Sequence, residues 1–290
     1  MTIVLSALAD RSSGEVHRIL DLPDDSQGLR DLSQANWGDS RAIIRGLAWT
    51  RIRVEGATIR PSLVECRLTN CEFRECRSEG HFWGAENAWE GCALSNVELI
   101  RPICPQNFFD QTQFTEVSLV GLDAYETVFK HCTFSGFTLE GFAAKRSLRP
   151  RKPFPELGSA PCSVAFVDCV FDQPVFERCM FAHVGFFGCD VREPQVRHCG
   201  FDGAVGDAWW RDVEAGNPRL GFVDALLECL EQARPGAGVV QQIRDFRASL
   251  ETGEGTPDDY DAIESACPDE ELDLLEGCFD RVKARVAWDF

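Results

Sequence analysis

Residues 169–191 read CVFDQPVFERCMFAHVGFFGCDV, and a large apolar side chain returns in this stretch every five residues. The large positions are Phe171, Phe176, Phe181, Phe186 and Val191. Two places before them stand smaller or thinner residues, namely Cys169, Pro174, Cys179, Val184 and Cys189. A β-strand repeats its side chains every two residues and an α-helix every 3.6. The stretch therefore predicts a chain that turns a corner every five residues.

The same period covers most of the chain. It runs without a slip from Leu94 to Leu139 and again from Phe166 to Phe201. Weaker versions precede these runs at Ile44, Trp49, Val54, Ile59, Leu68 and Phe73. Four corners make a square coil of about twenty residues, and such coils stack at the strand spacing of about 4.8 Å. No coil can bury its inward residues alone, so the pattern predicts a core that forms between stacked coils.

Several five-residue units resemble those of the pentapeptide-repeat family, whose repeat is roughly A/C-D/N-L/F-x-x. The units are CRLTN, CEFRE, CTFSG, CVFDQ, CMFAH and CGFDG. The resemblance covers about residues 40–203 and implies a right-handed quadrilateral β-helix. The chain departs from the family pattern by using Cys and Val where Ala is common, and it rarely has Asp or Asn before the large residue. These departures leave the predicted fold unchanged, but they weaken the transfer of any one subfamily's function to this chain.

Cysteine is unusually frequent, with 14 residues, and nine of them occupy the small inward position. Cys66, Cys71 and Cys76 lie five residues apart, which in a square coil places them on successive sides. Cys169 and Cys189 are one full coil apart, as are Cys179 and Cys199, so each pair stacks. Buried Cys behaves as a small hydrophobe. We interpret these thiols as core residues; a disulfide ladder or a metal site is the alternative reading.

Both ends of a β-helix need covering, because their backbone groups lack strand partners. Residues 1–39 are expected to form an N-terminal cap, with Ser12 and Glu15 as the capping box of a short helix. Trp209 and Trp210 are expected to close the far end. Residues 204–290 then predict an acidic helical domain. Its four helices are expected over 219–233, 238–251, 258–266 and 269–290.

A basic insertion interrupts the repeats at residues 145–162. Four prolines in it disfavour a regular element. Long loops on a rigid scaffold are often functional, although an idle exposed insertion is an equal alternative. The candidate partner-binding residues here are Lys145, Arg146, Arg149, Arg151 and Lys152.

Negative charge concentrates in the helical region. Residues 204–290 carry 20 acidic and 8 basic side chains, so they hold −12 of the formal net charge of −18. The densest cluster is a candidate docking patch for a cationic partner, with a solvated helix surface as the alternative. Its residues are Asp258, Asp259, Asp261, Glu264, Asp269, Glu270, Glu271 and Asp273.

The sequence has no motif that predicts catalysis. It lacks a phosphate-binding P-loop, a nucleophile elbow and a zinc-protease helix, so we expect no enzyme, no cofactor and no metal. No apolar run approaches the length of a membrane span, and the first residues lack a basic leader. A cytoplasmic protein is therefore expected. Its acidity argues against direct contact with nucleic-acid phosphates.

Two functions follow from the resemblance. The preferred one is a non-enzymatic immunity protein that binds and blocks a toxic enzyme, most plausibly a basic nuclease. The alternative is a DNA-mimicking protein that protects DNA gyrase from drugs or toxins. Residues 164–203 carry six acids and three bases, which is weak mimicry of a phosphate lattice. A passive scaffold and a homodimer also stay open.

Overall fold

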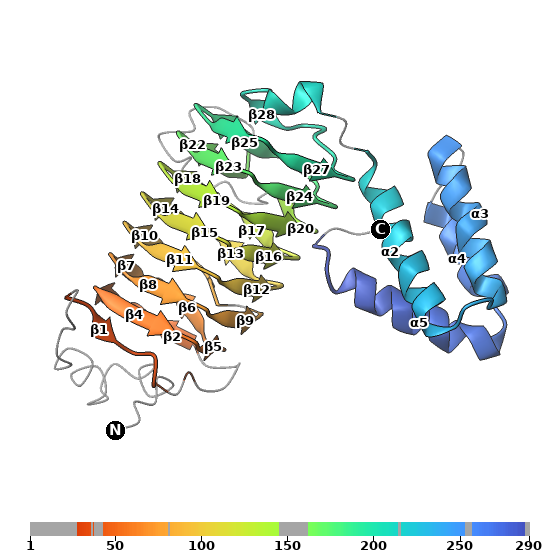
Figure 1. The fold of residues 1–290 in the computed structure, drawn as a ribbon, viewed down its shortest axis with the longest axis horizontal. Helices are drawn as coiled ribbons and strands as arrows, with labels where there is room; N and C mark the ends of the chain where they lie inside the picture. Colours follow the sequence, from red (N-terminus) through yellow and green to blue (C-terminus); the bar gives the residue numbers. More distant parts are fainter. Residues whose placement is uncertain are drawn as a thin grey trace.

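The computed structural model describes residues 28–35, 37, 43–80, 82–144, 162–213, 216–252 and 257–287. Its larger part is a parallel β-solenoid in which short strands turn around a four-sided coil, and a group of helices projects from one edge (Figure 1). The predicted β-helix is thus confirmed. The sides are numbered in the order in which the chain visits them from β2 onward.

Side 1 has two short sheets, one of β2 (Ile43–Arg45) and β6 (Ser62–Val64), the other of β13 (Ile103–Pro105), β17 (Asp123–Tyr125) and β21 (Ala143–Ala144). Side 2 has eight strands: β3 (Ala48–Thr50), β7 (Arg67–Thr69), β10 (Ala88–Glu90), β14 (Phe108–Asp110), β18 (Thr127–Lys130), β22 (Val164–Val167), β25 (Val184–Phe187) and β28 (Val205–Gly206).

Side 3 also has eight: β1 (Arg30–Asp31), β4 (Ile52–Glu55), β8 (Glu72–Arg74), β11 (Ala93–Ser95), β15 (Gln113–Thr115), β19 (Thr133–Ser135), β23 (Val170–Asp172) and β26 (Asp190–Arg192). Side 4 has seven: β5 (Thr58–Ile59), β9 (Arg77–Glu79), β12 (Glu98–Ile100), β16 (Ser118–Val120), β20 (Thr138–Glu140), β24 (Val175–Glu177) and β27 (Gln195–Arg197). Because β1 pairs with β4, the stacked sheets begin at Arg30, ahead of residue 40.

Strand register shows the length of each coil. Phe109 pairs with Phe129, twenty residues later, as the five-residue period predicts. The first coils deviate: Ile44 pairs with Leu63, nineteen residues later, and Leu68 pairs with Trp89, twenty-one later. Beyond the insertion, Phe129 pairs with Phe166, so the two runs of the period stack in one register.

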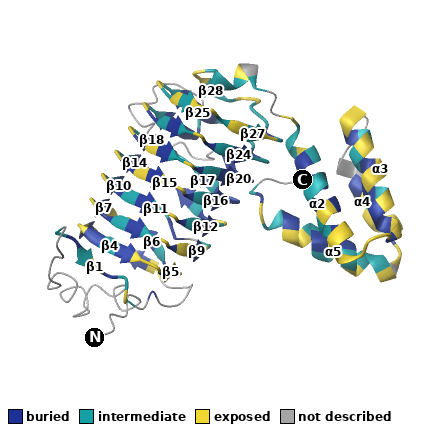
Figure 2. Ribbon diagram, viewed as in Figure 1, coloured by how far each residue is buried: buried dark blue, intermediate teal, exposed yellow. Residues whose placement is uncertain are grey.

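Large inward residues form the dry centre of the solenoid. In most strands the central residue is buried, and the flanking residues are mostly half-buried or exposed (Figure 2). Phe rings of successive coils lie parallel: the centroids of Phe114 and Phe134 are 4.7 Å apart, and those of Phe134 and Phe171 are 4.5 Å apart. Such stacking adds to the hydrophobic gain of burying each ring.

The small inward cysteines are in the core, as predicted, and they also act as donors. The Sγ of Cys132 lies 3.6 Å from the carbonyl oxygen of Phe109 and 3.3 Å from that of Lys130. In the same position of the coil below, the hydroxyl of Thr112 points to the carbonyls of Trp89 and Asp110. Cys and Thr are therefore interchangeable corner donors, a role that the hydrophobic interpretation of cysteine missed.

Two buried asparagine side chains satisfy backbone carbonyls around the one-residue insertion in the coil that contains Trp83. The side-chain amide of Asn87 donates to the carbonyl oxygens of Leu63, at 2.9 Å, and Trp83. Asn107, in the next coil, donates to the carbonyl of Gly84 at 2.9 Å. Buried backbone carbonyls must find donors, and these two amides supply them where the regular ladder is broken.

The far end is closed as predicted. Trp210 stacks on Phe201, with centroids 5.5 Å apart and planes 3° apart, and Trp209 packs on Phe186. At the other end Trp37 packs edge-on against Trp49. Ser12 and Glu15, the predicted N-terminal capping box, lie outside the described residues.

Four helices follow, as predicted: α2 (Pro218–Ala233), α3 (Gly238–Thr252), α4 (Pro257–Ala266) and α5 (Asp269–Lys283), after a short 3-10 helix η3 (Trp209–Asp212). Asn217 caps α2 by accepting the N–H of Arg219 at 2.9 Å. The expected helix over 269–290 ends instead at Lys283, because the chain turns back to the solenoid at Arg285. None of the helices within the described ranges is long and apolar enough to cross a bilayer.

Candidate protein-binding surfaces

The structure describes only part of the predicted site. Lys145, Arg146, Arg149, Arg151 and Lys152, the candidates in the basic insertion, lie outside the described residues. Their role stays a prediction.

The predicted acidic residues fall on α4 and α5. Asp258 and Asp259 belong to α4 and Asp269 begins α5, but their side chains are outside what the structure describes. Asp261 and Glu264 on α4 and Glu270 on α5 are exposed. At these three positions the carboxylates are available to a partner.

Glu271 has a structural role. Its two carboxylate oxygens accept the backbone N–H groups of Gly238, at 2.9 Å, and Val239, at 2.7 Å. These hydrogen bonds hold the pKa of Glu271 below its usual value. Glu271 therefore caps the start of α3 from α5, and both of its oxygens are already engaged.

Asp273 of the predicted cluster and two further acids belong to the same surface. Asp273, Glu276 and Asp280 are exposed on α5, while Leu275 and Cys278 of the same helix are buried. Spacings of three and four residues place all three on the solvent side of the helix. The predicted cluster stopped at Asp273, although the helical spacing of 270, 273, 276 and 280 contains the signal for the last two acids.

Acids from both α4 and α5 lie close enough to influence the same tyrosine. Tyr260 of α4 packs on Phe279 of α5, with ring centroids 5.0 Å apart. Burial, followed by the negative charges of Glu264, Asp261 and Asp280 among others, raises the pKa of the Tyr260 hydroxyl. The charges of Glu264 and Asp261 on α4 and of Asp280 on α5 therefore reach one site, and the exposed acids of the two helices are treated together. We call this group the acidic surface; it consists of Asp261, Glu264, Glu270, Asp273, Glu276 and Asp280.

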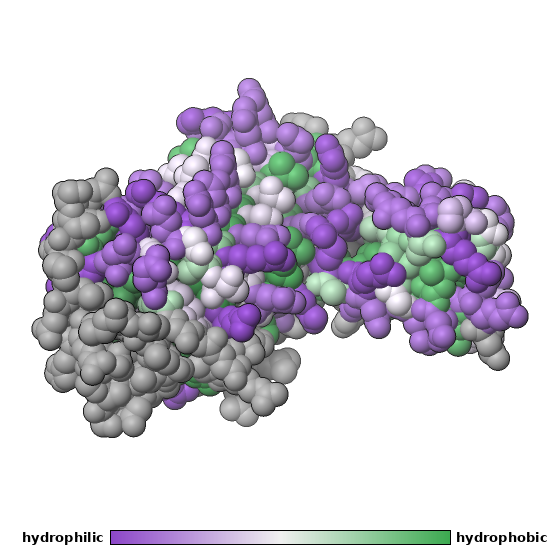
Figure 3. Space-filling model, turned by 60° about the horizontal axis from the view of Figure 1, so that its bottom comes forward, coloured by the Kyte–Doolittle hydropathy of each residue, from purple (hydrophilic) through white to green (hydrophobic). Residues whose placement is uncertain are grey.

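On α2 and α3 several acids are paired with arginines. Glu231 of α2 lies 2.6 Å from Arg244 of α3, and Asp224 of α2 binds Arg247 of α3. Within the part of the chain that the structure describes, no ion pair involves a side chain of the acidic surface. On the face seen in Figure 3, hydrophilic side chains cover much of the helical domain and surround a smaller hydrophobic area.

Much of the solenoid's charge is paired between neighbouring coils. Arg77 lies 3.2 Å from Glu98 on the next coil, and Arg53 lies 3.4 Å from Glu72. On a later corner, Nδ1 of His131 lies 3.0 Å from the carboxylate of Asp110. Such pairs cancel the long-range field of their members. The described solenoid therefore presents mixed charges rather than a uniform negative column.

A polar hollow of about 490 Å³ lies between sides 2 and 3. Arg51, Glu72 and Arg74 line it together with Asn70 and Gln113. Cys71 and Cys92 also border the hollow, but both are buried and donate to backbone carbonyls. The hollow offers polar contacts of both charge signs.

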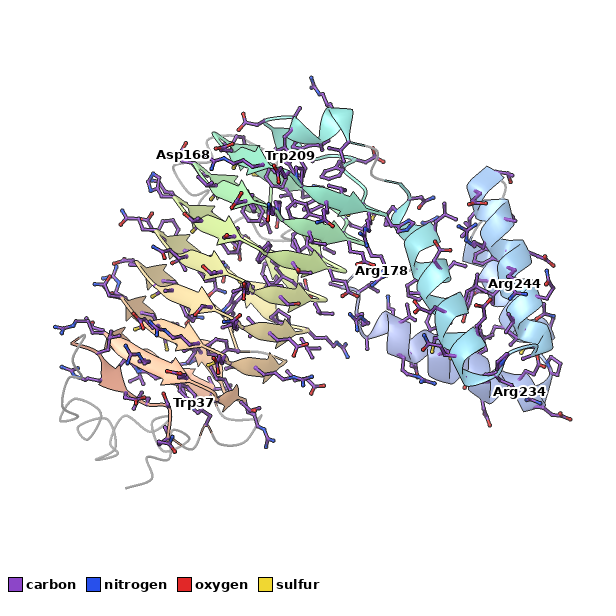
Figure 4. All side chains as sticks on the ribbon, viewed as in Figure 1. Trp37, Asp168, Arg178, Trp209, Arg234 and Arg244 are labelled. Atoms are coloured by element: carbon purple, nitrogen blue, oxygen red, sulfur yellow. The ribbon has the colours of Figure 1, made fainter. Side chains whose placement is uncertain are left out.

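The helical domain is joined to side 4 by a buried ion-pair cluster. The carboxylate of Glu140, 7% exposed, binds Arg178 of the next coil and Arg285 beyond α5. The backbone N–H of Ala287 donates to the carbonyl of Gly141 at 2.7 Å. Arg178 lies at the edge of the solenoid that faces the helices (Figure 4). These contacts fix where the acidic surface stands relative to the solenoid.

Comparison with known proteins adds weak similarities. No protein-family model matches the chain, and no curated protein does. Among solved structures, HetL, a pentapeptide repeat protein involved in heterocyst differentiation regulation from the cyanobacterium Nostoc sp. strain PCC 7120, is similar at 12% identity. That match covers 67% of this chain and 96% of HetL, with a TM-score of 0.26.

A second similar structure is QnrB1, a plasmid-mediated fluoroquinolone resistance protein. It is 11% identical over 58% of this chain and 94% of its own, with a TM-score of 0.22. The fold itself is established by the register of this chain's coils.

Proposed function

Because the chain folds as a pentapeptide-repeat β-solenoid, we propose that it is a protein-binding inhibitor, an immunity protein that neutralises a cationic, nuclease-type enzyme by direct contact. The observation that carries this proposal is the acidic surface of α4 and α5. Its exposed carboxylates form no ion pairs within the described residues, whereas three of the acids on α2 and α3, namely Asp224, Glu231 and Glu251, pair with arginines.

An unpaired negative surface suits a positively charged partner. Charge complementarity accelerates diffusional encounter and rejects wrong partners, because like charges repel. An enzyme that binds nucleic acid carries the complementary surface, since it must neutralise phosphates with Lys and Arg. An inhibitor that docks there would occupy the position of the substrate without any chemistry of its own.

The contacts at Glu140 support this use of the helical domain. A domain that moved freely relative to the solenoid would lose conformational entropy when its docking surface bound a partner. Here Arg285 and Ala287 hold the end of α5 on the solenoid. The acidic surface is thereby pre-organised, which favours tight binding.

Charge reversal on α5 tests the proposal. If a toxic enzyme is encoded beside this gene, the triple variant Asp273→Lys, Glu276→Lys and Asp280→Lys should associate with it about tenfold more slowly, or slower still. The association rate of the variant should also depend less on salt concentration between about 50 and about 300 mM. Rates are measured by biolayer interferometry with a catalytically inactive form of that enzyme.

The matched control reverses three exposed acids of the solenoid: Glu75→Lys, Glu79→Lys and Glu116→Lys. It makes the same change in net charge. Equal loss in both triples would reject docking by α5 and leave only a net-charge effect. Wild-type protein that neither binds the neighbouring enzyme nor relieves its toxicity would reject the immunity function.

The gyrase-protecting alternative has its own test. Purified protein is added in stoichiometric excess to a DNA gyrase supercoiling assay that contains a quinolone. Restored supercoiling would favour the alternative over the immunity function. The inter-coil ion pairs of the solenoid are the reason for ranking it second.

A further inference from the structure

Two cysteines meet between α2 and α5, away from the cysteines of the solenoid. The Sγ atoms of Cys229 and Cys278 are 2.7 Å apart. Cys278 is fully buried in the helical core, whereas Cys229 is half-buried and reachable from solvent. The pair belongs to two helices that pack along each other.

The surroundings of this pair differ from those of the solenoid cysteines. In the solenoid the thiols point to backbone carbonyls, as Cys132 does to Phe109. Here each sulfur faces the other, and the guanidinium of Arg281 lies 3.8 Å from Cys278. Burial raises the pKa of the Cys278 thiol to about 12, so this thiol stays protonated at neutral pH. Cys229 is consequently the sulfur that a reagent reaches first.

We propose that Cys229 and Cys278 are a redox modification site that closes into a reversible disulfide. The oxidant is a low-molecular-weight disulfide. The Cys229 thiolate attacks one of its sulfurs, forms a mixed disulfide and expels the first small thiolate. The Cys278 sulfur then attacks the Cys229 sulfur and expels the second. Two protein thiols lose two electrons and two protons, and the small disulfide gains them as two thiols.

A disulfide between Cys229 and Cys278 would constrain the helical domain, because both ends of this domain contact the solenoid. At one end, α2 starts against the solenoid, where Pro218 lies near Gly200. At the other, the chain after α5 returns to the solenoid, where Ala287 binds Gly141. A bond between Cys229 and Cys278 therefore closes a covalent loop that contains α3, α4 and most of the acidic surface. This inference does not depend on the proposed function.

The test uses the full chain, equilibrated at about pH 8 with oxidised and reduced glutathione in graded ratios. Free thiols are then alkylated, and intact mass and peptide mapping count and locate the cysteines. The expected result is loss of two alkylatable thiols and a cross-linked peptide joining Cys229 to Cys278. The thermal midpoint of the helical domain should rise by about 10 °C.

Single variants keep the proposal falsifiable. Cys229→Ser should abolish both the cross-link and the thermal shift, and it changes only a half-buried side chain. Cys162→Ser, which alters another half-buried thiol, should leave both intact. A disulfide mapped to Cys179 and Cys199, a stable mixed disulfide at Cys229, or 14 free thiols under the most oxidising mixture would each overturn the proposal.

Discussion

Arg285 holds the carboxylate of Glu140 with two hydrogen bonds of 2.7 and 2.6 Å, although 145 residues separate them in the chain. Glu140 lies on β20, the third strand of side 4 counted from β27, and Arg285 follows the last helix. Arg178, from the next coil, binds the same carboxylate. One buried acid thus joins two coils of the solenoid to the end of the helical domain.

Removing this acid should be costly. Glu140→Ala removes the buried acid that Arg178 and Arg285 share, while Glu177 still pairs with Arg178, so we expect a loss of about 2 kcal/mol in the free energy of unfolding. Arg285→Ala should cost about 1 kcal/mol, because Arg285 is 57% exposed and Arg178 still neutralises Glu140. Urea unfolding measures both. Glu98→Ala, which breaks an exposed pair on the same side, is the control, and an equal loss there would contradict the prediction.

The same carboxylate predicts a pH dependence. Burial by itself raises the pKa of Glu140, but the hydrogen bonds and charges of Arg285 and Arg178 outweigh it and hold the pKa below 4.5. Since the folded-state pKa is depressed, the stabilisation is fully present above the unfolded pKa. It is lost as the pH falls through the folded pKa. Unfolding free energies of the wild type should therefore drop more steeply below about pH 4.5 than those of Glu140→Gln. Parallel curves would argue against the pair.

Gly141 should be intolerant of a side chain. Its φ is +62°, and an added Cβ would lie 1.9 Å from the carbonyl oxygen of Arg285. Gly136 has nearly the same φ, +59°, but its nearest neighbour, Cγ of Glu116, would be 3.5 Å away. Gly136→Ala should cost only the backbone strain, about 1 kcal/mol. Gly141→Ala should cost more and should speed hydrogen exchange at the Ala287 amide, as NMR can measure. Unchanged exchange would mean that the contact is dispensable.

Asn87 should be needed for the irregular coil. Asn87→Ala removes the donors to Leu63 and Trp83 and leaves buried carbonyls unsatisfied, so we expect a loss of about 3 kcal/mol. Ser95→Ala, at an outward position of β11, should change the stability by less than about 0.5 kcal/mol. Guanidinium unfolding compares the two. Similar values would show that water or backbone adjustment replaces the amide.

The five-residue period was enough to predict the solenoid, its coil length and its core residues, because each large inward residue repeats one local requirement. It did not reveal the nineteen- and twenty-one-residue coils, since there the missing and extra residues are absorbed at corners and by Asn87. Nor did it reveal the binding of Glu140 to Arg285, which depends on how the last helix returns to the solenoid. Contacts between segments that are distant in the chain produce no repeating pattern in the sequence.

The acidic candidates were predicted in part. Composition located the negative region, and helical spacing extends it to Asp280. Composition alone cannot separate Glu270, which faces solvent, from Glu271, which caps α3 from its neighbouring helix. The distinction requires knowing which backbone groups lie opposite each carboxylate.

Register across the insertion has a consequence for how such a chain can change. Phe129 pairs with Phe166 and Phe109 with Phe129 in the same alignment, although the first pair spans thirty-seven residues and the second twenty. Extra chain between coils therefore leaves the stacking above and below unaltered. Gain or loss of a whole coil would slide the helices along the solenoid axis in fixed increments of about 4.8 Å. The distance between the N-terminal end of the solenoid and the helical domain can therefore change during evolution in steps of one coil.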